Sequence, residues 1–159
     1  MQKTIFAAVL AAFLMFCKCR AYAVDITASG GWVELLVDSS GLSAGENRLR
    51  SYESRADATI LDITGTADGK DAWLVRVRKS DGSWPEGVTV SLKRTDDGNG
   101  GGAINGGTSY TDISGSYVDF FDGSGDRTSI LVQYKISGVA ATLSPAVYGA
   151  SITFTVVDI

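Results

Sequence analysis

Three aspartates in the second half of the chain are the side chains best spaced to bind a ligand. Asp122 and Asp126 flank the segment Gly123-Ser124-Gly125, and Asp119 lies just upstream. Carboxylate and hydroxyl oxygens of this kind are the ligands that Ca²⁺ prefers. An EF-hand is excluded, because a loop counted from Asp122 lacks the glycine at its sixth position and the glutamate at its twelfth. A looser calcium site formed by the three aspartates is one hypothesis, and capping of a turn by the same residues is the other.

A second candidate site is Trp84, which stands in the turn-like segment from Ser83 to Gly87. An aromatic ring exposed at a turn is suited to stacking on a sugar ring. Together with aspartates in neighbouring turns, Trp84 therefore suggests carbohydrate as a ligand. The alternative is that its ring folds back over the end of the domain. Trp32 and Trp73 fall at inward-facing positions of predicted strands, where a role in the core is expected.

The residue types that most enzyme mechanisms need are missing. The chain has no histidine, and its two cysteines, Cys17 and Cys19, lie near the N-terminus. The side chain that titrates nearest neutral pH is therefore unavailable to the protein, and the sequence has no Gly-x-Ser-x-Gly motif. Paired carboxylates could still serve a glycosidase, but most of the aspartates fall in predicted turns. We therefore expect a protein that is not an enzyme and needs no cofactor beyond the hypothetical Ca²⁺.

Residues 1–23 have the pattern of a secretory signal peptide. Lys3 precedes an apolar run from Ile5 to Phe16, and Ala21 and Ala23 are the small residues expected before a cleavage site. The run has about 12 residues, whereas a helix that spans a bilayer needs about 20. We expect a secreted protein without a transmembrane anchor, located in the periplasm, at the cell surface or outside the cell.

The 136 residues that remain, 24–159, are enough for a single domain with its own core. Three of the 14 basic residues and none of the 18 acidic ones lie in the signal peptide, so this domain has 11 basic residues and a formal charge of −7. Such a surface repels phosphate backbones, which argues against nucleic acid as a partner. Both cysteines leave with the signal peptide, so the domain has to fold without a disulfide.

Alternation of apolar and polar residues, which is typical of antiparallel sheets, dominates this domain. The four clearest alternating segments are Ala72–Arg78, Val88–Lys93, Ile130–Ile136 and Tyr148–Val156. Weaker strands are predicted at Trp32–Asp38, Ala58–Thr64, Thr108–Ile113 and Tyr117–Phe121. About eight short strands with glycine-rich turns predict an all-β antiparallel sandwich of immunoglobulin-like or pilin-like type. The segment Ala44–Ala56 is interpreted as a long connection with a helical turn.

The inward-facing positions of these strands predict the core of the sandwich. It should consist of Trp73, Val75, Val77, Val88, Val90, Leu92, Ile130, Val132, Tyr134, Ile152, Phe154 and Val156.

The first residues after the predicted cleavage site form one more alternating segment. Val24, Ile26 and Ala28 stand at every second position and are followed by the breaker Ser29-Gly30-Gly31. A leading strand of this kind can detach and pair with an open sheet edge of a neighbouring molecule. The alternative is an edge strand that pairs within its own domain.

Two segments near the C-terminus resemble the last strand pair of secreted bacterial pilin-like sandwiches, including the spore-coat-U type. They are 129–136 and 148–156, in which Tyr148 opens a final strand of alternating threonines and large apolar residues. The domain also resembles uncharacterised exported bacterial proteins through the segments 93–100 and 120–127. The resemblance implies a structural protein without catalytic residues. The chain departs from the spore-coat-U pattern, because the domain has no cysteine pair and Val147 replaces the usual glycine before the tyrosine.

These observations together predict a secreted structural or adhesive subunit of a pilus, fibre or surface layer. Its partners would be proteins, copies of itself included, bound through the edges of β-strands. The alternative is a carbohydrate-binding module that uses Trp84 and nearby turn aspartates.

Overall fold

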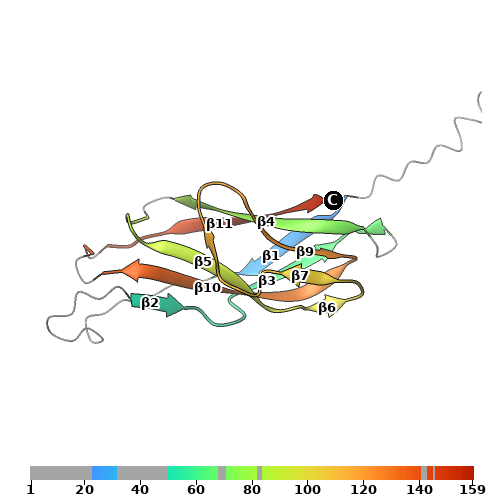
Figure 1. Ribbon diagram of the computed structural model, residues 1–159, viewed down its shortest axis with the longest axis horizontal. Helices are drawn as coiled ribbons and strands as arrows, with labels where there is room; N and C mark the ends of the chain where they lie inside the picture. The colour runs from blue at the N-terminus through green and yellow to red at the C-terminus, as the bar shows by residue number, and fades with distance from the viewer. Residues whose placement is uncertain (1–22, 32–49, 68–70, 82–83, 141–142, 145) are drawn as a thin grey trace, which may run out of the picture.

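The protein folds into two β-sheets (Figure 1). The computed structural model describes residues 23–31, 50–67, 71–81, 84–140, 143–144 and 146–159. Within these ranges, no helix is long and apolar enough to cross a membrane. The described strands are β1 (Asp25–Gly30), β2 (Arg50–Glu53), β3 (Thr59–Thr64), β4 (Ala72–Asp81), β5 (Thr89–Asp96), β6 (Asn99–Gly100), β7 (Ile104–Gly106), β8 (Thr111–Ile113), β9 (Val118–Ser124), β10 (Arg127–Val139) and β11 (Ala150–Asp158).

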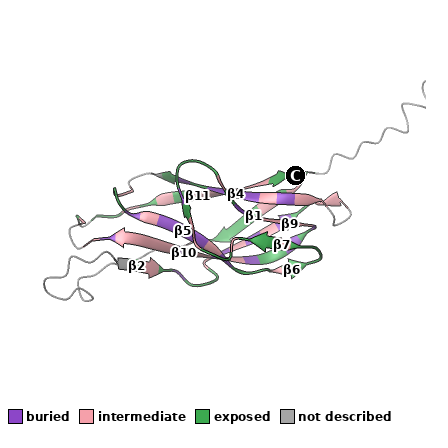
Figure 2. Cartoon of the chain, in the orientation of Figure 1, coloured by how far each residue is buried: buried purple, intermediate pink, exposed green. Residues whose placement is uncertain are grey.

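The two sheets pack face to face as a sandwich. The seven-stranded sheet has the order β1-β3-β10-β5-β8, with β2 and β6 pairing along β10, and the four-stranded sheet has the order β11-β4-β9-β7. All of these strand pairs are antiparallel. The predicted fold class, an all-β antiparallel sandwich, is therefore confirmed. Figure 2 shows that the buried residues concentrate in the central strands, whereas every residue of β1 and β11 is intermediate or exposed.

The strongly alternating segments are found as strands, and the short strands were not predicted. The four clearest segments correspond to β4, β5, β10 and β11, and Ala58–Thr64 corresponds to β3. The helical turn in Ala44–Ala56 is wrong for Arg50–Glu53, which pairs with β10 as β2. Residues 44–49 and the predicted strand Trp32–Asp38 lie outside the described residues. Short strands such as β2 depend on a partner strand more than on their own alternation, so their sequences do not reveal them.

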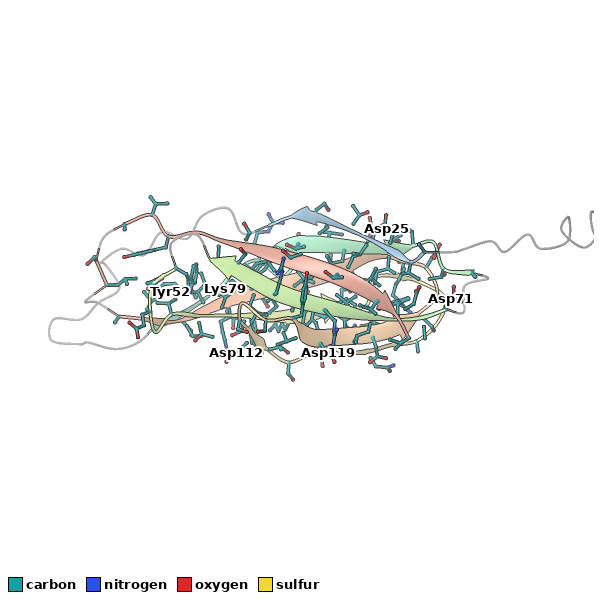
Figure 3. The ribbon with its side chains drawn as sticks, turned by 90° about the horizontal axis from the view of Figure 1, so that it is seen from above. Asp25, Tyr52, Asp71, Lys79, Asp112 and Asp119 are labelled. Atoms are coloured by element: carbon teal, nitrogen blue, oxygen red, sulfur yellow. The ribbon has the colours of Figure 1, made fainter. Side chains whose placement is uncertain are left out.

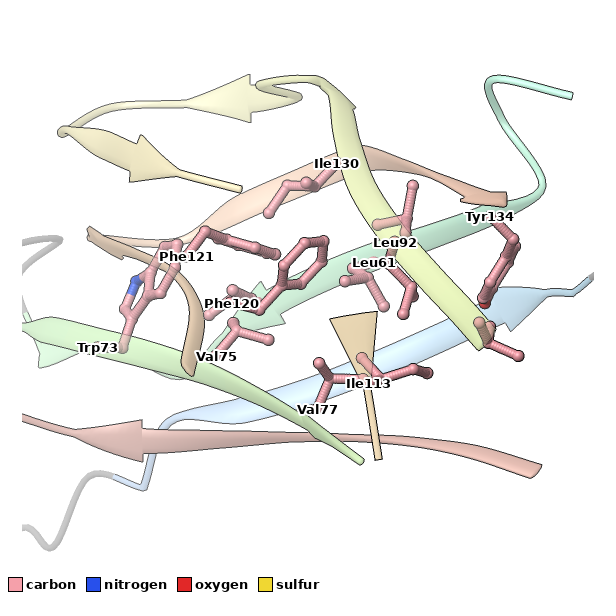
Figure 4. Packing of buried hydrophobic residues seen from close by; sticks show 13 residues of the cluster. Leu61, Trp73, Val75, Val77, Leu92, Ile113, Phe120, Phe121, Ile130 and Tyr134 are labelled. Atoms are coloured by element: carbon pink, nitrogen blue, oxygen red, sulfur yellow. The ribbon is translucent and has the colours of Figure 1, made fainter. Parts of the chain in front are cut away.

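A single apolar cluster fills the space between the sheets (Figure 4). Nine of the twelve predicted core residues are buried, among them Trp73, Leu92 and Ile130, which are fully inaccessible to solvent. Phe120 and Phe121 are adjacent in β9, yet both are buried. A register shift between β4 and β9 after Val75 explains this, because such a bulge lets two successive side chains point to the same face.

Trp73 sets the packing at one end of the core. Its indole lies edge-on to Phe121, with ring centroids 6.0 Å apart, and its Nε1 donates a hydrogen bond of 2.9 Å to the Gly125 carbonyl. A Cβ atom added to Gly123 would lie 2.5 Å from the Trp73 ring. The segment Asp122–Ser124 was predicted as part of a turn, which is wrong: it ends β9, and its glycine leaves room for the tryptophan.

The Gly123→Ala substitution is therefore expected to destabilise the fold by about 1–3 kcal/mol, because a methyl group there overpacks the core against Trp73. Gly101→Ala is the matched control, since nothing lies within 4 Å of a Cβ at that position. Urea unfolding of the two variants measures the difference. Equal stability of Gly123→Ala and Gly101→Ala would contradict the packing described here.

Candidate functional site

The leading strand lies in its own domain. β1 pairs along its whole length with β3, from Asp25 opposite Thr64 to Gly30 opposite Thr59. Val24 and Ile26 are partly buried and pack against the core, whereas Ala28 is exposed. The structure thus has the second of the two predicted arrangements, an edge strand within its own sheet.

The two sides of the sandwich have edge strands of very different length. On one side, called here the long-edge side, the edges are β1 with six residues and β11 with nine, and these two strands contact each other. On the other, called the short-edge side, the edges are β7 and β8 with three residues each. In Figure 3, Asp25 of β1 and Asp119 of β9 lie on opposite sides of the molecule. Very short edge strands prevent pairing with other chains. Only the long-edge side therefore offers extended backbone for such pairing among the described strands.

β11 has few of the features that keep an edge strand from pairing. Its sequence, Ala-Ser-Ile-Thr-Phe-Thr-Val-Val-Asp, has no lysine, arginine, proline or glycine, and its one charge is at the last position. Natural edge strands are usually interrupted by such residues. Threonine, valine, isoleucine and phenylalanine also favour the extended conformation. Within the described residues, β11 pairs only with β4, so its second edge carries backbone groups that no described strand binds.

Apolar side chains along this side are only half covered. Ile152, Phe154 and Val156 were predicted to be core residues; they pack against the core but are only partly buried, as is Ile26 in β1. Their neighbours on β4, such as Val77, are fully buried because strands flank β4 on both sides. The partial exposure of the β11 residues follows from its place at the edge. The long-edge side therefore combines unpaired backbone with apolar surface.

Trp84 folds back onto the end of the sandwich. Its Nε1 donates a hydrogen bond of 2.6 Å to the Val88 carbonyl, and the Lys79 ammonium lies 4.9 Å from the ring centroid. The ring is partly buried and packs against the core. This is the alternative to an exposed stacking platform, because protein groups already occupy part of the indole surface.

A shallow hollow of about 330 Å³ lies beside the turn that carries Trp84. One aromatic ring, Tyr148, and one carboxylate, Glu86, contribute to its wall, and the Tyr148 hydroxyl donates a 2.7 Å hydrogen bond to the Ser144 carbonyl. The hollow is lined by Pro85, Glu86, Val88, Gly138, Ala140, Leu143, Ser144 and Tyr148.

The three aspartates of the calcium hypothesis each have a protein partner of their own. Asp119 accepts a hydrogen bond of 2.7 Å from Arg76, and Asp122 accepts one of 3.0 Å from Asn105. Asp126 accepts two from Thr66, from its backbone nitrogen and its hydroxyl, and these lower the pKa of Asp126. Among the residues that the structure describes, no three acidic, histidine or cysteine side chains come close enough together to hold a metal ion.

Two buried arginines, which the sequence reasoning missed, organise the glycine-rich segment between β5 and β8. Arg94 binds the Gly106 carbonyl through Nε and Nη2 and forms an ion pair with Asp97. Arg127 donates to the carbonyls of Asp97 and Gly102. Burial and the nearby charge of Arg127 lower the pKa of Arg94. The available signal was that both arginines belong to the two segments, 93–100 and 120–127, that carried the resemblance to exported proteins.

Comparison of the chain with family models, with curated proteins and with solved structures gave no match. The two-sheet antiparallel fold is therefore established by the structure, and the choice between immunoglobulin-like and pilin-like types rests on the residues of the last strand pair alone.

Replacing Arg94 by lysine is expected to destabilise the fold by about 2–3 kcal/mol, because an ammonium cannot reproduce the two bonds to the Gly106 carbonyl and the bond to Asp97. Arg76→Lys is the control, since Arg76 forms an ion pair with Asp119 but is exposed, and such pairs contribute at most about 1 kcal/mol. Thermal unfolding of both variants tests this. A larger loss for Arg76→Lys would show that the buried pair is not what holds the segment.

Proposed function

We propose that the protein is an exported structural or adhesive subunit that assembles through the open strand edges of its long-edge side. The observation that carries the proposal is the contrast between the two sides of the sandwich. The short-edge side ends in strands of three residues, whereas β11 offers nine residues with a single terminal charge. A protein that had to stay monomeric would be expected to protect both sides.

The composition supports the same proposal. Residues 1–23 have the pattern of a secretory signal, so the protein would work in the periplasm, at the cell surface or outside the cell. The sequence has no histidine, and the domain after the signal has no cysteine, so the chain lacks the groups on which most enzymes depend. A charge of −7 favours solubility of the free subunit, and addition of a strand to an edge requires no charge on either partner.

Self-assembly can be measured on residues 24–159, which contain every described strand. Sedimentation velocity should detect species larger than the monomer whose share rises with protein concentration. Lysines introduced on both long edges, by Ala28→Lys and Ser151→Lys together, should weaken association by roughly tenfold, because charged side chains there hinder the approach of another strand.

The matched control is Thr108→Lys, which adds the same charge at an exposed residue just before β8 on the short-edge side. It should associate as the unmodified chain does. A protein that stays monomeric up to millimolar concentration, or equal weakening by the control, would overturn assembly through the long edges.

A carbohydrate-binding module is the second candidate, and the hollow beside Trp84 is the observation that favours it. Tyr148 and Glu86 would provide a ring and a carboxylate for a sugar there. Tyr148→Ala should then reduce retention on insoluble polysaccharide at least as much as Trp84→Phe, which keeps the aromatic ring and loses the hydrogen bond to Val88. Equal retention of the unmodified protein and of both variants would remove this candidate.

A further inference from the structure

The sequence of β11 reads almost the same in both directions. Around Phe154, each threonine has a threonine as its counterpart (Thr153 and Thr155), and Ile152 has the similar Val156. The residues at 152, 154 and 156 pack on the core, so those at 153 and 155 face the outer surface of the sheet. An antiparallel partner with the same sequence would therefore meet matching side chains on both faces.

We infer that two copies of this chain pair antiparallel through their β11 edges, about a two-fold axis that passes Phe154. This inference rests on the proposed assembly through the long edges and names its first contact and register. Phe154 then lies opposite its own copy, Thr153 opposite Thr155, and Ile152 opposite Val156. A contact of this kind uses the same surface on both molecules, which is the commonest symmetry of dimers.

The charges on β11 are compatible with this partner. Its single charged residue, Asp158, would lie opposite Ala150 of the other copy, at the far end from the second Asp158. No like charges therefore meet across the pair. The two four-stranded sheets would become one continuous sheet, and the half-covered side chains Ile26, Phe154 and Val156 would gain apolar neighbours from the second molecule.

Disulfide trapping tests the register. Residues 24–159 contain no cysteine, so Thr153→Cys and Thr155→Cys can be made as two separate chains, each with a single thiol. Direct neighbours across an antiparallel pair are within disulfide reach, and diagonal neighbours are not. After equal amounts are mixed and oxidised, about half of the dimers should become covalent, because only mixed pairs bring the two sulfurs together. Each variant alone should stay uncross-linked.

A charge pair gives an independent measurement without oxidation. Thr153→Glu with Thr155→Glu places two like-charged pairs across the axis, although each glutamate would have Arg78 or Arg76 beside it in its own molecule. The dimer should weaken by roughly tenfold. The matched control, Thr153→Lys with Thr155→Glu, places opposite charges across the same axis and should keep the dimer.

The outcomes separate the inference from the proposed function. Cross-linking of either variant with itself, or loss of the dimer in both charge variants, would overturn the Phe154 register while assembly through the long edges stands. A chain that forms no dimer at any concentration would overturn both. Cross-linking of the mixture alone, together with loss of the dimer only in the two-glutamate variant, would establish the pair.

Discussion

The backbone groups of every strand need hydrogen-bond partners, and this requirement governs the whole molecule. The central strands β4 and β10 meet it on both sides, so their inward side chains, such as Trp73, Val75 and Ile130, are sealed from water. β1 and β11 meet it on one side only in the described residues, and their apolar side chains are half covered. Burial and function are therefore two consequences of the same distribution of strand pairs.

The glycine-rich segment between β5 and β8 shows how the domain compensates for having no disulfide. Arg94 and Arg127 enter this segment from neighbouring strands and bind its carbonyl groups, which replaces a covalent constraint by buried hydrogen bonds. Charged donors form strong bonds when they are buried. On this side the strands can stay short, because β7 and the loops around it are held by side chains as well as by sheet pairing. The short-edge side is thus both rigid and closed to other chains.

The sequence predicted the strands whose inward faces alternate strictly, and it missed features that depend on a partner. Val75, Val77 and Leu92 could be placed in the core because their spacing allows only one buried face. Phe120 and Phe121 break that spacing through a bulge, and β2 forms only because β10 extends beyond β3. Trp84 and the aspartates at 119, 122 and 126 were recognised by type, but their hydrogen-bond partners are far away in the chain. The open edge of β11 could not be predicted, since openness is a property of the sheet order and not of the strand.

The central claim is that the free edge of β11 binds another molecule. Amide hydrogen exchange of residues 150–158, followed over a range of protein concentrations, tests it most directly. We expect the amides that face away from β4 to exchange rapidly in dilute solution and to become protected as the concentration rises. Protection that is already complete at the lowest concentration would mean that the edge is covered within one chain, and rapid exchange at every concentration would mean that nothing binds there. Either result would contradict the account.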